Sequence, residues 1–192
     1  YSPCEKWILT SSWSGLSAVW KKENLELHKS YVGHTDRVVE SDWHPASGLP
    51  NGPTSSAANF VSASADGTAM VWSLDQAEKP LAALRGHAAR LAHVAWHPFG
   101  RAVATTSYDH TWRMWDVEQA KELLCQEGHA VEVYSLGFQC DGSLVATGDL
   151  GGVVRVRFAC MRGTSRRYLR FTVLLGNCCR CGTLGQASPF YS

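Results

Sequence analysis

The dipeptide Gly-His occurs three times in this chain, at positions 33–34, 86–87 and 128–129. These copies are 53 and 42 residues apart, and three tryptophans, Trp20, Trp72 and Trp115, recur at nearly the same intervals of 52 and 43 residues. A fixed period of this size indicates an array in which each repeat is one supersecondary unit that packs against its neighbours.

Each repeat contains the pattern of a β-hairpin. In residues 60–72 and 103–115, small and β-branched residues alternate on either side of an Asp-Gly or Asp-His turn. An earlier apolar run ends in Trp-His-Pro at positions 43–45 and again at 96–98. We therefore predict four short strands per repeat, joined by Pro or Gly turns. The Ser-, Pro- and Gly-rich span 46–58 lengthens one of these turns and is interpreted as a surface loop.

These marks resemble WD repeats, in which each repeat supplies one four-stranded propeller blade. A closed propeller needs more blades than 192 residues can supply at about 40–45 residues each. The resemblance therefore predicts an all-β, incomplete WD-repeat β-propeller of about three to three and a half blades. Because Tyr1 starts in the middle of the pattern, we expect a piece of a larger ring.

Charge divides the chain into two parts. Residues 1–149 carry 11 Lys and Arg against 17 Asp and Glu, whereas residues 150–192 carry seven Arg and no Lys, Asp, Glu or His. We predict a partial propeller over residues 1–156 and an Arg- and Cys-rich tail over 157–192 that is disordered or out of frame. There is no pattern of a secretory signal or membrane-spanning segment, and the scattered cysteines of the repeat region favour a reducing compartment.

A polar set recurs in two repeats, and its hydroxyl, Asp and Trp members keep the same spacing in both. Its members are His34, Ser62, Asp66 and Trp72 in one repeat and His87, Thr105, Asp109 and Trp115 in the next. The resemblance implies structural tetrads in which Asp accepts from His, His meets the hydroxyl, and the hydroxyl meets the indole N–H. The same residue types could suggest a Ser/His/Asp hydrolase. That alternative is disfavoured, because an active site occurs once and no Gly-x-Ser-x-Gly motif is present.

The first and last repeats depart from this template. Ser14 stands where Asp is expected in the first, with Thr10 in the hydroxyl position. The last keeps His129 and Thr147, but the template places Gly151 at the Asp position and Arg157 at the Trp position. We therefore expect incomplete sets in both.

More specific strings narrow the resemblance to one family. These strings are Ser11–Leu16, Gly33–Val38, Asp42–Pro45, Thr105–Asp116 and Leu123–His129. In this order they resemble the propeller of the pre-mRNA-processing factor four family, the WD component of the U4/U6 small nuclear ribonucleoprotein. Membership implies a nuclear, non-enzymatic scaffold of the U4/U6·U5 tri-snRNP in pre-mRNA splicing. It also implies a partner of the pre-mRNA-processing factor three type and direct or indirect contact with U4/U6 snRNA. The alternative is a WD adaptor of another complex, such as a ubiquitin ligase or a signalling scaffold.

Four residues are candidates for partner binding at the rim of the propeller: Trp13, Arg37, Arg90 and Tyr108. An exposed aromatic ring near an arginine suits an interface hot spot. No residue is predicted to be catalytic, and no cofactor, metal, membrane or small-molecule substrate is expected. In the tail, the basic run 162–170 is interpreted as unstructured rather than RNA-binding. Cys160, Cys178 and Cys181 lack the second Cys pair that a structural zinc site prefers.

Overall fold

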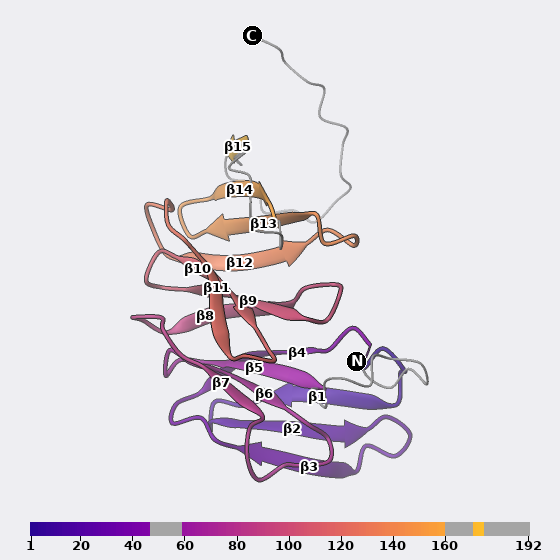
Figure 1. Cartoon of the computed structure of the whole chain (residues 1–192). Coiled ribbons are helices and arrows are strands. Elements are labelled where there is room, and N and C mark those ends of the chain that lie inside the picture. The colour runs from indigo at the N-terminus through magenta and orange to yellow at the C-terminus, as the bar shows by residue number, and fades with distance from the viewer. Residues whose placement is uncertain (47–58, 160–170, 175–192) are drawn as a thin grey trace.

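The computed structural model describes residues 1–46 and 59–159 and the backbone of residues 171–174. Every regular element in these residues is a β-strand in an antiparallel sheet, which confirms the all-β, propeller-like prediction. Figure 1 shows four sheets that follow one another in chain order, from indigo strands at one end to orange strands at the other. The predicted loop 46–58 lies outside the described residues except for Ala46, as do the tail cysteines and the basic run.

Each sheet is a meander in which sequential strands pair. The first sheet consists of β1 (Trp7–Ser11), β2 (Leu16–Lys21) and β3 (Leu27–Val32). The second consists of β4 (Val38–Trp43), β5 (Phe60–Ser64), β6 (Ala69–Trp72) and β7 (Ala82–Leu84). The third consists of β8 (Leu91–Trp96), β9 (Ala102–Ser107), β10 (Trp112–Asp116) and β11 (Lys121–Gln126). The fourth consists of β12 (Val133–Phe138), β13 (Leu144–Asp149), β14 (Val153–Phe158) and β15 (Phe171–Leu174).

The fourth sheet extends beyond the predicted repeat region. Strand β14 runs to Phe158, two residues past the predicted boundary at 156, and β15 pairs with it antiparallel. The described part of residues 157–192 thus completes a four-stranded sheet. The division into a repeat region and a tail stays a prediction.

The hydrophobic core lies between the sheets. Three clusters of buried residues fill the three interfaces: Tyr31 and Trp72 belong to the first, Val71 and Trp115 to the second, and Trp112 and Leu136 to the third. The inner strands bring the sheets together, since β4 packs on β1, β8 on β4, and β12 on β8. Adjacent sheets therefore stabilise one another by burying apolar area.

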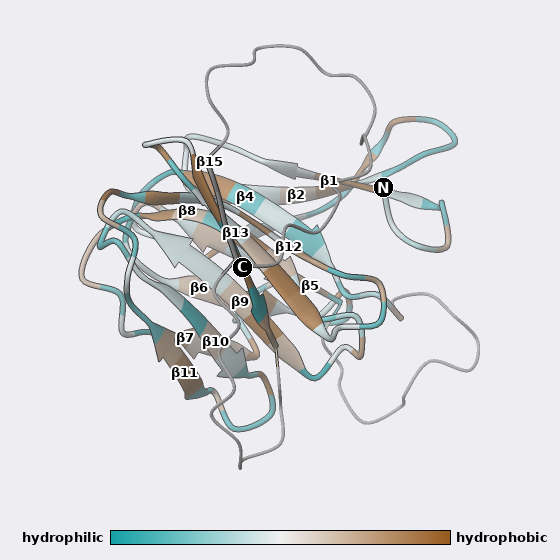
Figure 2. Cartoon of the chain, turned by 90° about the horizontal axis from the view of Figure 1, so that it is seen from above, coloured by the Kyte–Doolittle hydropathy of each residue, from teal (hydrophilic) through white to brown (hydrophobic). Residues whose placement is uncertain are grey.

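The two middle sheets are covered on both faces. All residues of β5, β6 and β9 are buried, whereas β14 in the fourth sheet is only half-buried along most of its length. This explains why β5 reads as an unbroken run of apolar and small residues, seen in brown in Figure 2. The polar residues that do occur in these strands are buried and need hydrogen-bond partners.

Candidate functional site

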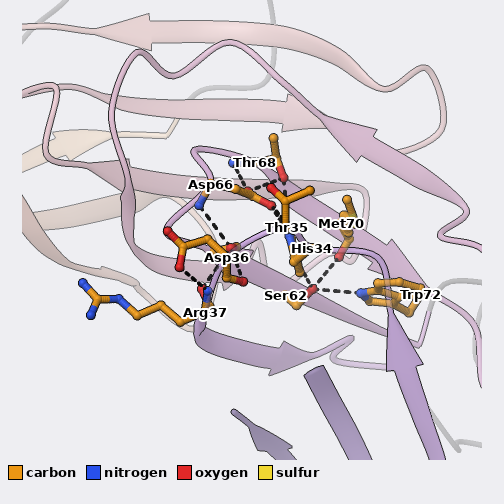
Figure 3. A network of polar contacts seen from close by, with 10 residues as sticks. His34, Thr35, Asp36, Arg37, Ser62, Asp66, Thr68, Met70 and Trp72 are labelled. Atoms are coloured by element: carbon orange, nitrogen blue, oxygen red, sulfur yellow. Dashed lines mark hydrogen bonds and ion pairs between the residues drawn. The ribbon is translucent and has the colours of Figure 1, made fainter. Parts of the chain in front are cut away.

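The predicted polar set of the second sheet is assembled in one row (Figure 3). His34 Nδ1 lies 3.1 Å from Asp66 Oδ2, and His34 Nε2 lies 2.7 Å from Ser62 Oγ. Trp72 Nε1 donates to the same Ser62 Oγ at 2.8 Å. The row links the connection before β4, strand β5, the β5–β6 turn and strand β6.

The third sheet repeats this geometry. His87 Nδ1 lies 2.8 Å from Asp109 Oδ2, and His87 Nε2 lies 2.8 Å from Thr105 Oγ1. Trp115 Nε1 donates to Thr105 Oγ1 at 2.8 Å. The two carboxylates also accept backbone N–H groups, from Thr35 in one sheet and Ala88 in the next.

Burial sets the protonation of these groups. It lowers the pKa of His34 and His87, although the neighbouring carboxylates act in the opposite direction. Burial alone would raise the pKa of Asp109, but hydrogen bonds from Thr111 and His87 lower that pKa to about 2. A neutral imidazole beside an ionised carboxylate assigns the ring proton to Nδ1, so Nε2 accepts from the hydroxyl. Ser62 and Thr105 have no exposed surface, so a substrate has no path to either oxygen.

The prediction of an incomplete set in the last repeat is wrong for its carboxylate. Asp149 Oδ2 lies 2.8 Å from His129 Nδ1, and Thr147 Oγ1 lies 2.9 Å from His129 Nε2. Asp149 precedes the predicted position, Gly151, by two residues at the end of β13. Its carboxylate still reaches the imidazole because the β13–β14 turn folds back, with Val153 N donating to Asp149 Oδ1. The tryptophan is replaced, as expected, by Arg157.

The first sheet keeps only part of the set. Trp20 Nε1 donates to Thr10 Oγ1 at 2.9 Å, and this pair is exposed. Ser14 bonds instead with Ser12, at 2.8 Å between their hydroxyl oxygens.

A second type of recurring contact joins successive sheets and was missed by the sequence reasoning. His44 Nε2 lies 3.0 Å from the carbonyl oxygen of Gly100, and His97 Nε2 lies 3.1 Å from that of Gly142. Both histidines are buried and belong to the two Trp-His-Pro turns. Both glycines have φ near +70°, and a Cβ there would lie within 2.6 Å of the imidazole. The repeated Trp-His-Pro strings could have indicated a recurring role for these histidines, but they do not specify the glycine carbonyl that each one contacts.

Two carboxylates on β4 bind the backbone of β8. Glu40 Oε2 accepts from Val94 N at 3.0 Å, and Asp42 Oδ2 accepts from Trp96 N at 2.9 Å. Burial raises the pKa of both carboxyls, that of Glu40 to about 7. These carboxylates accept hydrogen bonds from backbone N–H groups on the edge of β8, which would otherwise lack partners.

The four predicted rim residues form two cation–π pairs. The Arg37 guanidinium lies 5.4 Å from the centre of the Trp13 ring, and the Arg90 guanidinium lies 3.8 Å from that of Tyr108. Trp13 is 81% exposed. Figure 3 shows Arg37 extending away from the polar row.

Sheets two to four share one backbone pattern at this rim. Tyr108 N donates to Arg90 O, Ala65 N donates to Arg37 O, and Leu150 N donates to Glu132 O. In the second sheet, Ala65 offers no ring to Arg37, which instead meets Trp13 of the preceding sheet. Leu150, 55% exposed, is a rim residue that the sequence reasoning missed because Gly151 had been assigned to the Asp position.

In the described parts of the chain, no group of three or more His, Cys, Asp or Glu side chains is placed to hold a metal ion. Cys4, Cys125 and Cys140 are free thiols. No helix among the described residues is long and apolar enough to cross a membrane.

Comparison with known proteins supports the repeat assignment. The WD domain, G-beta repeat, matches residues 25–73, 78–116 and 120–157. The chain is 35% identical over 125 residues to the U4/U6 small nuclear ribonucleoprotein PRP4 of Saccharomyces cerevisiae, which covers 63% of this chain and 25% of that protein. It is 28% identical over 133 residues to a coronin-like protein of the same organism, which covers 61% of this chain and 19% of that protein. Rat coronin-7 is 37% identical over 78 residues, which cover 40% of this chain and 8% of that protein.

This chain therefore spans a quarter or less of these relatives. The three matched segments cover most of it, and each runs from the last strand of one sheet through the first three strands of the next. WD-repeat proteins are in general non-catalytic scaffolds for protein–protein interaction. On the repeat matches and the four-sheet architecture together, the chain belongs to the WD-repeat family.

Proposed function

We propose that this chain is part of a non-catalytic, nuclear scaffold of the U4/U6 snRNP that acts in pre-mRNA splicing. The observation that carries the proposal is the 35% identity to the U4/U6 small nuclear ribonucleoprotein PRP4, together with the family-specific strings between Ser11 and His129. The partners would be spliceosomal proteins, including one of the pre-mRNA-processing factor three type. Contact with U4/U6 snRNA would be direct or through these proteins.

The proposed contact surface is the rim that carries the two cation–π pairs. An arginine laid on an aromatic ring is held in one orientation, so less side-chain entropy is lost when a partner binds. Exposed Trp, Tyr and Arg side chains are also the types that dominate binding energy at interfaces. These properties favour Trp13, Arg37, Arg90 and Tyr108 as partner contacts.

The proposed role of the two tetrads is structural. Their hydroxyls are buried, and each is bonded on one side by an imidazole and on the other by an indole. Recurrence in successive sheets supports a role in shaping every sheet. A chemical step would need only one such set.

The second candidate is an adaptor of another assembly, such as a ubiquitin ligase or a signalling complex. The observation that favours it is the similarity to coronins, which covers nearly as much of this chain as the similarity to PRP4. Both candidates use the same fold, so only the identity of the bound partners separates them.

The test is a pull-down from nuclear extract with the tagged 192-residue chain, followed by sequencing of bound RNA and identification of bound proteins. The proposal expects U4 and U6 RNA with spliceosomal proteins, and Trp13→Ala should lower their recovery at least fivefold. The matched control is Phe99→Ala, which removes another exposed aromatic ring, in the β8–β9 turn. Recovery of a different complex without snRNA would establish the second candidate. Equal recovery with Trp13→Ala and Phe99→Ala would refute the rim assignment.

A further inference from the structure

The hairpin turns at the rim rest on the connections that lead into the next sheet. A Cβ on Gly15, in the β1–β2 turn, would lie 3.2 Å from the carbonyl oxygen of Asp36. A Cβ on Gly67, in the β5–β6 turn, would lie equally close, at 3.2 Å, to that of Ala89. Turns and connections of the first three sheets therefore form one continuous row, which holds its side chains in a fixed order before any partner binds.

Two arginines on this row carry a charge that no carboxylate balances. Within residues 1–46 and 59–159, neither Arg37 nor Arg90 forms an ion pair, whereas Arg113 pairs with Glu122 at 2.5 Å. The contacts that hold the two rim guanidinium groups are aromatic rings, at 5.4 and 3.8 Å from the ring centres. A ring below a planar guanidinium leaves the N–H groups at its edge free to donate.

The second sheet lies between the two guanidinium groups. Arg37 contacts Trp13 of the first sheet, and Arg90 contacts Tyr108 of the third sheet. The equivalent turn position of the second sheet is Ala65, which has no ring. The rim thus presents two separate single charges, which do not converge on one point as the dianion of a phosphate group would require.

The sign of the charge reverses at the fourth sheet. Leu150 N donates to Glu132 O just as Tyr108 N donates to Arg90 O, so Glu132 takes the place of the arginine. Exposed Asp36 also directly precedes Arg37 (Figure 3). The row of the rim therefore alternates in sign.

This alternation opposes binding of a nucleic-acid strand. A polyanion is held by a continuous row of cations, whereas carboxylates interrupt the row on this rim. Residues 1–149 carry 11 Lys and Arg against 17 Asp and Glu, so the surroundings add to the repulsion. Single carboxylates fit better, because each planar guanidinium can donate two parallel hydrogen bonds to one carboxylate.

We propose that the rim binds an extended acidic segment of a partner protein, with one carboxylate on Arg37 and a second on Arg90. Stacked sheets lie about 10 Å apart, and two carboxylates four residues apart in an extended chain lie on one side of it and about 14 Å from each other. That spacing spans two neighbouring sheets and allows for the outward lean of both arginines. The inference rests on the contact surface proposed above and defines the chemistry of the partner that this surface selects.

The test is an NMR titration of the full chain, with the indole N–H signal of Trp13, assigned through Trp13→Phe, as the reporter. The probe is a short Gly/Ser peptide with two glutamates four residues apart, and its control has glutamines in their place. We expect the glutamate peptide to shift the Trp13 signal saturably and to leave that of buried Trp72 in place. The glutamine peptide should bind about fivefold more weakly or worse.

Substitutions of Arg90 test the charge directly. Arg90→Gln should weaken binding of the glutamate peptide about threefold or more. The matched control is Arg101→Gln, which removes the same charge from an exposed position in the β8–β9 turn, at the opposite end of the strands, and should leave binding unchanged. Arg90→Glu should reverse the preference and bind a lysine version of the peptide better than the glutamate version.

Three results would overturn the inference. They are equal affinity for the glutamate and glutamine peptides, equal effects of Arg90→Gln and Arg101→Gln, and tighter binding of an oligoribonucleotide than of the glutamate peptide at the Trp13 signal. If Arg90→Gln fails to fold by circular dichroism, Arg90→Lys decides, since it keeps the charge, loses the planar fork and should weaken binding about twofold.

The splicing role and the acidic partner fail in different experiments. A chain that binds the glutamate peptide but recovers no snRNA in the pull-down would support this inference and refute the splicing role. Recovery of the snRNP by a chain that does not bind the glutamate peptide would refute this inference alone.

Discussion

The tetrad of the second sheet leads to a quantitative prediction for Ser62→Ala. The substitution removes one oxygen and leaves no cavity of consequence, so its cost comes from hydrogen bonding. Ser62 Oγ is the shared partner of His34 Nε2 and Trp72 Nε1, at 2.7 and 2.8 Å. Both groups would lose that partner in the interior, at about 1–3 kcal/mol each. Because the two bonds share one oxygen and are not additive, we expect a loss of roughly 3 kcal/mol in the free energy of unfolding.

Thr10→Ala is the matched control, because the first sheet contains the same kind of pair at its surface. Trp20 Nε1 donates to Thr10 Oγ1 at 2.9 Å, but the pair is exposed and water can replace the hydroxyl. The expected loss is below about 1 kcal/mol. The two variants therefore differ in the burial of the bond far more than in its geometry.

The assay is urea unfolding followed by tryptophan fluorescence and by far-ultraviolet circular dichroism. Coincident transitions from the two probes would justify a single free energy of unfolding. The midpoint of Ser62→Ala should fall well below that of Thr10→Ala, with similar slopes for both variants. Equal midpoints for the two variants, or a wild-type midpoint for Ser62→Ala, would refute the role assigned to the buried tetrad.

Two further substitutions test the contacts between sheets. Gly100→Ala should lower the free energy of unfolding by at least about 2 kcal/mol, because the residue has φ +70° and its Cβ would lie 2.5 Å from buried His44 Nε2. Gly137→Ala, with nothing within 4 Å of its Cβ, is the control in the same urea series, and equal losses would contradict the steric account. Glu40→Gln tests the raised pKa of a carboxyl between β4 and β8. Since the folded pKa of about 7 lies above the ordinary 4.5, the stability contributed by Glu40 is full below pH 4.5 and is lost as the pH rises through 7. Between pH 5 and pH 8, the free energy of unfolding of the glutamine variant should therefore rise by about 1–2 kcal/mol relative to the wild type. This is less than the full pKa shift implies, because the Glu40 side chain is 34% exposed. His93, whose pKa burial lowers, lies 3.1 Å from Glu40, so the comparison is made above about pH 6.5 as well as below it. A difference that is constant with pH would disprove the assignment.

Much of the architecture follows from local sequence patterns. Alternation over residues 60–72 and 103–115, with Asp-Gly and Asp-His turns, predicted the hairpins β5–β6 and β9–β10. The constant offsets among Ser62, Asp66 and Trp72, together with the Gly-His before them, also predicted which side chains would meet. Such patterns are informative because side chains alternate across a strand with a period of two, so residues at fixed offsets share a face.

The fixed offset predicted the wrong residue for the tetrad carboxylate of the fourth sheet, where the β13–β14 turn differs from the corresponding turns. Gly151 has the offset of the tetrad carboxylate, but Asp149 makes the contact, because the position of an oxygen depends on how the β13–β14 turn folds. Because the carboxylate was placed at position 151, the equivalent rim position was also misplaced, and Leu150 was not predicted as a rim residue. The division at residue 156 stays a prediction; in the structure β14 runs to Phe158 and pairs with β15.

The sequence by itself determined the strands of the repeats, their order and the polar sets of the second and third sheets, because these depend on patterns along the chain. Only the tertiary structure decided the contacts between sheets. It brought His44 to the carbonyl of Gly100, Glu40 to the backbone of β8, and Arg37 to the Trp13 ring of the preceding sheet. These partners lie in different repeats, and nothing in the local pattern specifies them. Their pairing follows from how inner strands pack on one another, which is set by the shapes of whole buried faces.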